Sequence, residues 1–386
     1  MAGCVPSSAT LLRWSRMTER PSVGVGLMSG TSLDGMDAAL VRFTGPTRAE
    51  LLAFTSCAYD RDMRQSLEDA ITSYTAADLA RLHARLGHLA VAACQQVLDE
   101  SHHPATQVDF ISFPGHTVWH QPPTVSWQLG DPAIVAETFG TRVIHDFRAR
   151  DIAAGGEGAP LVPMADMLLF GHRGHPRVLL NIGGMANLTY VPRAAVDDGV
   201  LAFDTGPGMA LIDELARNVD PALSCDIDAV VSSQGKADPA VVEDLLTDEF
   251  FRRSPPKSTG RERFGAAVAR DIASRVPGPD GVATAVVLTV ESIARAITQW
   301  VPAPLSEVVV SGGGRRHPGV IRGLEVRLAS GGTAVRLFDD VFFDGDAKEA
   351  VAFALLGYLT VHGQPGNLPA ATGARAARVL GSITPP

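Results

Sequence analysis

Short apolar, strand-like runs alternate along most of this chain with longer stretches of helical periodicity. The strand-like runs include 22–27, 38–43, 177–184, 186–191, 200–206 and 307–314. Apolar residues recur at helical spacing in 76–100 and 283–301. An alternation of this kind predicts an α/β fold in which helices cover the sheets.

The order of these elements is similar in the two halves of the chain. GVGLMSGTSLDGMDAALV, residues 24–41, reads as a strand, a Gly-rich turn and a second strand, and LLNIGGMANLTYV, residues 179–191, reads the same way. We therefore expect two similar lobes with a cleft between them, which is where ligands usually bind.

Composition excludes several classes of function. With 386 residues, 46% of them hydrophobic and 19% charged, the chain is long enough for two folded domains. A net charge of −9 argues against a nucleic-acid surface, which needs clustered Lys and Arg. Cys4, Cys57, Cys94 and Cys225 form no CxxC pair, which favours a reducing compartment. No apolar run reaches the roughly 18 residues of a membrane span, so we expect a cytoplasmic protein without membrane partners.

Three Gly-rich turns follow apolar strands, at Gly30–Gly35, Gly206–Gly208 and Gly312–Gly314. Glycine lets backbone N–H groups approach a ligand closely, and consecutive amides bind anions. Hydroxyl groups accompany two of the turns, at Thr31, Ser32 and Thr205. None is a P-loop, since no Gly-Lys-Ser/Thr follows. A single turn is more often structural, but three in one chain indicate a nucleotide site.

Asp204 lies at the carboxyl end of a strand in AFDTGPGMALIDELARN, residues 202–218. A carboxylate beside a phosphate-binding turn can act as a general base on an attacking nucleophile. An Asp at this point can equally be an N-cap or turn residue. The position alone leaves both roles open.

Seven ordered motifs give the chain a specific resemblance. Six of them are residues 26–41, 130–140, 146–163, 181–189, 203–213 and 255–264, and the seventh, near the C-terminus, combines DAKEAVAFALLGY with GQPGNLPAATGA. Together they resemble the anhydro-N-acetylmuramic acid kinase family, from residue 26 to the C-terminus. The resemblance implies an α/β, two-lobed actin/Hsp70/sugar-kinase (ribonuclease H-like) fold with a central cleft.

The resemblance also implies a reaction and its cofactors, ATP and Mg²⁺. The enzyme would open the 1,6-anhydro bridge of its sugar with water and phosphorylate O6, giving N-acetylmuramic acid 6-phosphate for cell-wall recycling. Asp204 would be the base that activates the water. The cofactor-binding residues would be Gly30, Thr31, Ser32, Leu33, Asp34, Gly35, Met36, Asp37, Thr205, Gly206, Gly208, Gly312, Gly313 and Gly314. The metal ligands are not identified.

Other residues would face the sugar. Glu349 is placed near the cleft by the family pattern, or is instead an exposed helix-start Glu favoured by the dipole. Asp131 and Arg148 would contact sugar hydroxyls or the lactyl carboxylate, or form a structural pair. Thr117 would be a further contact to the sugar. His120 and His145 are expected to be packing or surface residues.

The chain departs from the family pattern in two places. SFPGHTVWHQP, residues 112–122, has Pro114 where the family has histidine and His116 where it has glutamine, so that Gly115 and Thr117 remain. His116 would supply one replacement donor, or the selectivity for the sugar would change. Met209-Ala210 also replaces the usual Asn. Neither change touches Asp204 or the Gly30 turn.

Two other hypotheses about function remain. One is a kinase for another 1,6-anhydro sugar such as levoglucosan, and the other is a non-catalytic ATP-binding scaffold of the same superfamily. The expected organisation is a disordered extension at 1–21, an N-terminal lobe at 22–145 with part of 365–386, and a C-terminal lobe at 146–364. A homodimer with a small-molecule sugar as substrate is expected from the family.

Overall fold

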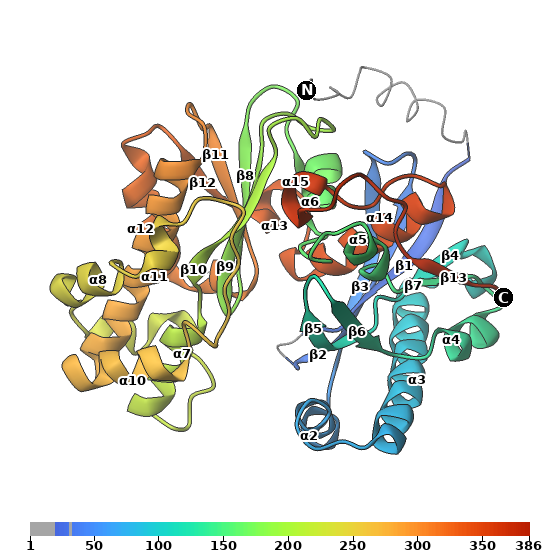
Figure 1. Ribbon diagram of the computed structural model, residues 1–386, viewed down its shortest axis with the longest axis horizontal. Helices are drawn as coiled ribbons and strands as arrows, with labels where there is room; N and C mark the ends of the chain where they lie inside the picture. The colour runs from blue at the N-terminus through green and yellow to red at the C-terminus, as the bar shows by residue number, and fades with distance from the viewer. Residues whose placement is uncertain (1–19, 31–32) are drawn as a thin grey trace. The chain divides into compact units, whose positions relative to one another are not determined.

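The computed structural model describes residues 20–30 and 33–386, and its chain divides into two compact units (Figure 1). Unit 1 runs to Leu169 and resumes at Ala347 for the rest of the chain, and unit 2 is Phe170–Asp346. Thr31, Ser32 and all but the last two residues of the expected extension lie outside the described residues.

Unit 1 is built on a six-stranded sheet in the order β13-β7-β4-β1-β2-β3. Strands β1, β2 and β3 form an antiparallel meander, β4 and β7 run parallel to β1, and β13 is antiparallel to β7. The strands are β1 Ser22–Met28, β2 Gly35–Phe43, β3 Ala49–Ala58, β4 Phe110–Ser112, β7 Val143–His145 and β13 Ser382–Thr384. A separate hairpin pairs β5 His116–Gln121 with β6 Val125–Leu129.

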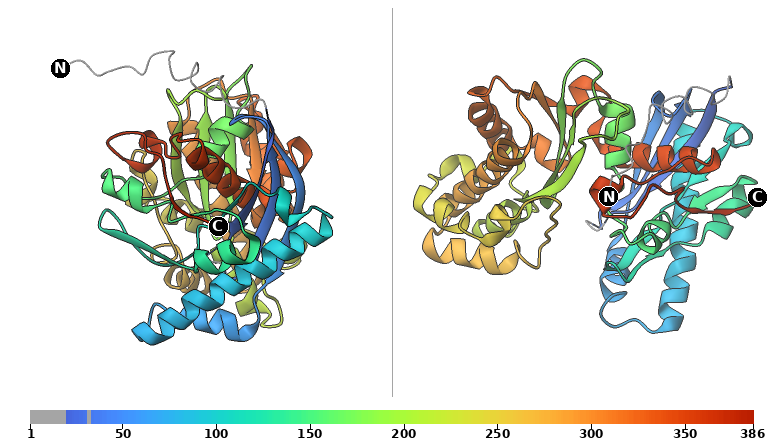
Figure 2. Two further views of the ribbon diagram at one scale, coloured as in Figure 1. Left: turned by 90° about the vertical axis from the view of Figure 1, so that its right-hand side faces the viewer. Right: turned by 45° about the horizontal axis from the view of Figure 1, so that its top comes forward.

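Two long helices pack against this sheet on opposite faces because side chains alternate along β1. Val25 and Leu27 belong to the core cluster with α3, Ala76–Glu100. On the other face a Cβ on Gly26 would come within 2.0 Å of a backbone oxygen of α14, Lys348–Val361. Glycine in β1 therefore allows α14 to approach the sheet closely. Figure 2 shows both helices against the strands.

The remaining helical segments of unit 1 are short. They are α2 Arg61–Asp69, η1 Ala105–Gln107, α4 Pro132–Phe139, α5 Ala149–Ala153, α6 Pro163–Ala165 and α15 Pro369–Thr372. The one-turn segment η2, Asp166–Phe170, ends at the unit boundary.

Unit 2 is built on a five-stranded sheet in the order β10-β9-β8-β11-β12. Its first three strands form an antiparallel meander, and β11 and β12 run parallel to β8 and to each other. The strands are β8 Arg177–Ile182, β9 Met185–Val191, β10 Leu201–Pro207, β11 Glu307–Ser311 and β12 Ala334–Leu337. This is the order of β3-β2-β1-β4-β7 in unit 1, so the similarity that the sequence shows between its halves is a similarity of topology.

Helices α7, α8, α10 and α12 of unit 2 pack against α11, Pro279–Trp300, whose buried apolar side chains contribute to the core cluster of the unit. The other helical segments are α7 Ala210–Val219, η3 Ile227–Ala229, η4 Ser232–Gln234, α8 Pro239–Leu245, α9 Glu249–Arg252, α10 Ala266–Arg275, η5 Gly313–Arg316, α12 Pro318–Ala329, α13 Phe338–Val341 and η6 Gly345–Ala347, the last of which ends at the first residue of unit 1.

The expectation that no segment is long and apolar enough to span a membrane is wrong for helix α11. It has 22 residues and a mean hydropathy of 1.4, and by length and composition it meets that test. Inside unit 2, however, 78% of this apolar window is buried. Burial of this kind is also what a core helix requires.

The α/β class and the organisation in two sheet-based units are confirmed. The unit bounds differ from the expected 22–145 and 146–364. Unit 1 continues to Leu169 because α5 contacts β6 and α6 contacts α14. The segment from Ala347 onward also belongs to unit 1, because α14 packs on β1, β2 and β4.

Candidate functional site

A pocket in unit 1 brings three of the predicted site residues together. Gly30, Thr117 and Arg148 line it, and they were predicted as a phosphate-loop residue and two sugar contacts. Met28, Ser29, Pro114, Gly115, Gln128 and Phe353 complete its lining. The pocket therefore joins the β1–β2 turn, the β5–β6 hairpin and α14.

The β1–β2 turn is closed by its own backbone. The Leu33 N–H donates to the carbonyl of Gly30 at 3.2 Å, and Leu33 has a left-handed backbone with φ 60°. The carbonyl of Asp34 accepts the Tyr59 N–H at 3.0 Å, which ties the turn to the end of β3. Thr31 and Ser32, between these two anchors, lie outside the described residues.

Two residues predicted as cofactor ligands have structural roles instead. Met36 has no exposed surface and belongs to the core of unit 1, so the prediction of a ligand contact is corrected to a packing role. Gly35 lies so close to β3 that an added Cβ would come within 2.4 Å of the Cys57 carbonyl oxygen. Asp37, two residues further on, is opposite Met28 in the register of β1 and β2.

A buried hydroxyl–imidazole group lies behind this turn. The Ser29 Oγ is 2.6 Å from the Tyr59 hydroxyl and 2.8 Å from His116 Nδ1. Burial lowers the pKa of His116 to about 4, so the ring is neutral at pH 7. His116 thus does not line the pocket itself but contacts the lining residue Ser29, whereas Pro114 is part of the lining.

Charged side chains of unit 1 gather around Glu349, in the first turn of α14. Burial is the largest cause that raises the pKa of Glu349, Asp37 raises it further, and Lys348 and Arg148 lower it. The Lys348 Nζ lies 2.9 Å from Asp166 Oδ1. The structure therefore places Asp37 and Arg148 within electrostatic reach of Glu349, and Glu349 is not the exposed helix-start residue of the alternative interpretation.

The other sugar-side candidates are held by local hydrogen bonds. Asp131 caps α4, because its Oδ1 accepts the Ala133 N–H at 2.9 Å. Thr117 Oγ1 accepts from the Gln128 side chain at 3.3 Å. Arg148 Nη1 donates to the Gly158 carbonyl at 2.9 Å, and burial lowers the pKa of Arg148. Asp131 thus has a structural function, whereas Thr117 and Arg148 line the pocket.

Asp204 in unit 2 is held on two sides by the segment Lys257–Thr259. Its N–H donates to the Lys257 carbonyl at 2.9 Å, and its Oδ2 accepts the Thr259 N–H at 2.8 Å. Burial raises the pKa of Asp204 to about 6 and Glu262 raises it further, although the Thr259 N–H and Lys257 oppose the rise. A fixed carboxyl with a pKa close to neutrality can take a proton through its remaining oxygen.

The turn after Asp204 differs from the predicted phosphate loop. The N–H groups of Gly208, Met209 and Ala210 donate to the carbonyls of Gly183 and Gly184 at 2.8–3.1 Å. These three amides are therefore already hydrogen-bonded to the β8–β9 turn. A Cβ on Gly208 would come within 2.3 Å of the Gly183 oxygen. The prediction that Gly208 binds phosphate is corrected, because its N–H is used within the protein.

Thr205 and Gly206 likewise have structural reasons for their positions. The register of β10 shifts between Asp204 and Gly206, and the buried Thr205 hydroxyl donates to the Ala186 carbonyl at 3.1 Å. Gly206 has φ 144°, and an added Cβ would come within 2.8 Å of the Phe251 ring. Both residues shape the strand end that carries Asp204.

The β8–β9 turn at Gly183–Gly184 was not among the three turns predicted to bind a nucleotide. It has the same place in unit 2 as the Gly30 turn in unit 1, between the first two strands of the meander. An added Cβ on Gly184 would lie 3.4 Å from Arg261 Nη2. The sequence NIGGMAN, residues 181–187, has the same pattern of strand, glycines and strand as the Gly30–Gly35 turn, and this pattern could have indicated it.

Gly312–Gly314 lies at the carboxyl end of β11 and is fixed by Arg315. Gly312 has φ 79°, and an added Cβ would come within 2.6 Å of Asn181 Oδ1, while Gly313 faces open space. Arg315 N–H and Nη1 donate to the Gly312 carbonyl at 3.1 and 3.3 Å. The predicted role of these glycines in binding the cofactor stays a prediction.

Comparison of the sequence with known proteins shows the family of this chain. The sequence model of the family described as anhydro-N-acetylmuramic acid kinase matches residues 22–386. The chain belongs to this family. A relative named anhydro-N-acetylmuramic acid kinase from Gloeobacter violaceus is 42% identical, with 95% of this chain and 99% of the relative covered. One of the same name from Bacillus cereus is 35% identical, with 94% and 98% covered.

Solved sugar kinases are more distant from this anhydro-N-acetylmuramic acid kinase family member. A ROK hexokinase from Thermus thermophilus has a TM-score of 0.36 at 15% identity, covering 89% of this chain and 100% of that one. A ROK family glucokinase from Streptomyces griseus, in complex with glucose and AMPPNP, has a TM-score of 0.38 at 13% identity, covering 86% and 98%.

The carboxylates of unit 1 would suit a Mg²⁺ ion that is held together with substrate phosphates. Among the described residues, no group of three or more His, Cys, Asp or Glu side chains could hold a metal ion alone. Mg²⁺ needs no such group, since it is usually held by one or two carboxylates together with substrate phosphates. Asp37 supplies a carboxylate at the base of the Gly30 turn, in electrostatic contact with Glu349.

Proposed function

We propose that this chain uses ATP and water to convert 1,6-anhydro-N-acetylmuramic acid into N-acetylmuramic acid 6-phosphate. Membership of the family supports the kinase activity and the sugar. The observation that carries the chemistry is the Asp204 carboxyl, whose Oδ2 accepts the Thr259 N–H and whose pKa burial raises to about 6, while the main-chain N–H of Asp204 is fixed by the Lys257 carbonyl.

In the proposed reaction, Asp204 takes a proton from water as the water oxygen bonds to the anomeric carbon. The bond between that carbon and O6 breaks, and O6 takes the γ-phosphoryl group of ATP, which leaves ADP. One base is sufficient because opening the bridge generates the second nucleophile. Mg²⁺, when bound, would offset the charge on the phosphates.

The two units would supply different binding groups. In unit 1 we assign the phosphates to the Gly30 turn with Asp37, and the sugar to Thr117, Arg148 and Glu349. The Arg148 guanidinium suits the lactyl carboxylate of the sugar, because Arg pairs with carboxylates through two parallel hydrogen bonds. In unit 2 we assign further phosphate contacts to Gly184 with Arg261, in place of Gly206 and Gly208, because the Gly183 N–H already donates to the Met185 carbonyl at 3.0 Å.

The product formed in ¹⁸O-labelled water tests this function. With ATP, Mg²⁺ and the anhydro sugar, mass spectrometry is expected to find ¹⁸O at the anomeric carbon and phosphate on O6. Levoglucosan serves as the matched anhydro sugar without the amide and lactyl groups. Product from levoglucosan alone would contradict the proposed substrate, and ATP binding without product from either sugar would contradict the proposed reaction.

The pH profile of kcat/KM is expected to show an acidic limb at about pH 6. Asp204 must be ionised to accept a proton, and burial raises its pKa to about 6. Activity is therefore present above this pH and falls about tenfold for each pH unit below it. Steady-state rates between pH 4.5 and 8.5 measure the limb, and a limb near pH 4 would show that a different group controls it.

Glu349→Gln is expected to lower kcat/KM for the sugar about 10- to 100-fold, because a hydrogen bond to a charged group contributes about 1.5–3 kcal/mol. Steady-state kinetics with varied sugar measures this change. Glu137→Gln, an exposed position in α4 of the same unit, is the matched control and should leave the rates unchanged. An unchanged kcat/KM in the Glu349 variant would remove this residue from the site.

We also propose that the protein is a cytoplasmic homodimer. Cys57, Cys94 and Cys225 are free thiols, as expected in a reducing compartment. Sedimentation analysis of the full chain tests the dimer.

A further inference from the structure

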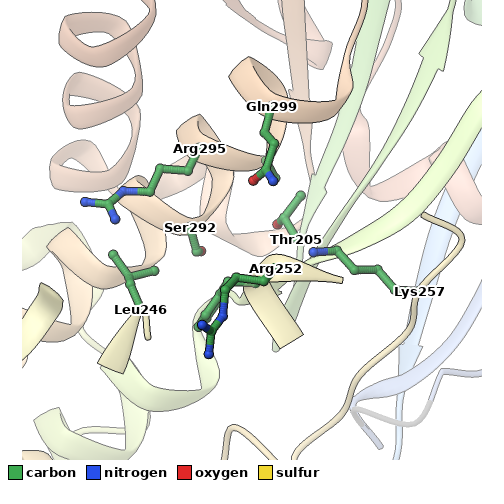
Figure 3. A pocket seen from close by; sticks show the side chains of 9 residues that line it. Thr205, Leu246, Arg252, Lys257, Ser292, Arg295 and Gln299 are labelled. Carbon is green, nitrogen blue, oxygen red and sulfur yellow. The ribbon is translucent and has the colours of Figure 1, made fainter. Parts of the chain in front are cut away.

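A second pocket lies within unit 2, between the C-terminal half of α11 and the strand β10 (Figure 3). Helix α9 and the segment that carries Lys257 complete it. Its lining consists of Thr205, Leu246, Phe251, Arg252, Lys257, Ser292, Arg295, Ala296 and Gln299. Thr205 is the one lining residue that was predicted from the sequence, and the proposed reaction gives it no contact with a substrate.

The charge of this pocket is entirely positive. Three of its nine lining residues, Arg252, Lys257 and Arg295, are cations, and no Asp or Glu lines it. Among the described residues, Arg252 and Lys257 form no ion pair, whereas Arg295 pairs with Glu243 and Glu291. A chain with a net charge of −9 has many carboxylates available, so unpaired cations around one hollow point to an anionic ligand.

Lys257 is the buried member of this set, with 6% of its surface exposed. Its Nζ donates to the Phe250 carbonyl at 3.0 Å and lies 4.6 Å from the centroid of the Phe250 ring. That carbonyl is its one hydrogen-bond partner among the described residues. An ammonium carries three N–H donors, so two are left for a ligand. Burial, with a contribution from Arg253, lowers the pKa of Lys257 to about 8 although Asp204 opposes this shift, and an anion in the pocket would offset the remaining cost.

The other donors lie at the rim. In Figure 3 the ammonium of Lys257 points toward Thr205 and the Gln299 amide, and the two guanidinium groups lie on the other side of the view. One N–H of Arg252 is used, since Nη2 donates to the Thr247 carbonyl at 2.8 Å. A guanidinium has five N–H donors, in a fork that matches phosphate oxygens.

We propose that this pocket binds a phosphate group, either as inorganic phosphate or on a small phosphate monoester. Lys257 and the two arginines would donate to the phosphate oxygens, and the apolar side chains of Leu246, Phe251 and Ala296 would exclude water and strengthen these contacts. The proposal does not rest on the proposed enzymatic function.

The pocket also has a direct structural link to Asp204. The carbonyl of Lys257 accepts the Asp204 N–H at 2.9 Å, and Thr205 at the floor of the pocket follows Asp204 in β10. A ligand that moves Lys257 would therefore act on the strand end that carries the proposed base.

Calorimetric titration of the full chain with inorganic phosphate and with glucose 6-phosphate tests the proposal. We expect saturable binding of at least one compound, weakened tenfold or more when Arg252→Gln and Arg295→Gln are combined, because charged hydrogen bonds are lost. Arg322→Gln, which removes an exposed arginine of α12 outside the pocket, is the matched control and should not change the affinity.

A second variant separates the pocket from general electrostatics. Ala296→Leu keeps every charge and adds volume to the pocket wall, and it should weaken binding as well. Tighter binding of glucose 6-phosphate would identify a monoester as the ligand, and tighter binding of inorganic phosphate would identify the free ion. Binding of neither compound, or an affinity unchanged in both pocket variants, would overturn the proposal.

Discussion

Asp204→Asn is expected to lower kcat by about 10²- to 10⁴-fold, the usual contribution of a positioned general base. The amide keeps the size of the side chain, and its oxygen can still accept the Thr259 N–H that now holds Oδ2 at 2.8 Å. What the variant loses is the group that takes the proton from water. Single-turnover measurements with saturating ATP and sugar separate this loss from any effect on product release.

The same variant should not lose its fold, and its stability gives an internal control. Burial raises the folded-state pKa of Asp204 to about 6, above the ordinary value of 3.8. The ionised carboxylate is thus less favourable in the folded state, and this destabilisation grows as pH rises from 3.8 to about 6. Above pH 6 we expect Asp204→Asn to be more stable than the parent by on the order of 1–3 kcal/mol, measured by urea unfolding.

Asp213→Asn is the matched control for both measurements. Asp213 lies in α7 of the same unit, and burial also raises its pKa, but its Oδ1 accepts the Asp226 N–H and it is outside the proposed site. Its kcat should stay within a few fold of the parent. A near-normal kcat for Asp204→Asn, or an equal loss in Asp213→Asn, would contradict the assignment of Asp204 as the base.

The sequence predicts the repeated strand–turn–strand organisation because it depends on local patterns. Apolar runs and glycines mark β1, β2, β8 and β9, and the units have the same strand order. The roles of individual glycines are less predictable, since they depend on what lies opposite. Gly35 and Gly208 look like ligand-binding residues in the sequence, yet an added Cβ on either would meet a backbone carbonyl of another segment.

The site is predictable to the extent that its residues belong to motifs. Asp204 and Arg148 could be singled out in this way, and the structure places Arg148 with Asp37 and Glu349 around one charged cluster. The supporting contacts could not be predicted, because they join distant segments. Thr259 lies 55 residues from Asp204, and His116 lies 87 residues from Ser29. No local pattern indicates which backbone amide will meet a given carboxylate.

Arg315→Gln is expected to be the most destabilising of the substitutions considered. The Arg315 side chain is 4% exposed and donates to Asp339 at 2.6 Å, Asp346 at 2.7 Å and Asp344 at 3.2 Å. Removing one partner of a buried ion pair costs about 3–5 kcal/mol. The three carboxylates are 35–54% exposed and regain some hydration, so we expect a loss of roughly 2–4 kcal/mol from the free energy of unfolding.

Two comparisons make this prediction specific. Hydrogen bonds from Arg315 lower the pKa values of Asp339 and Asp346, so its contribution is present above the ordinary carboxyl pKa and is lost as pH falls through the lowered values. The difference in the free energy of unfolding between parent and variant, measured with urea, should therefore become smaller at acidic pH. Arg316→Gln removes an exposed partner of Asp346 and should cost about 1 kcal/mol or less.

Because Arg315 also holds the Gly312 carbonyl, the KM for ATP should rise in Arg315→Gln and not in Arg316→Gln. An unchanged KM would show that the Gly312–Gly314 turn does not take part in nucleotide binding.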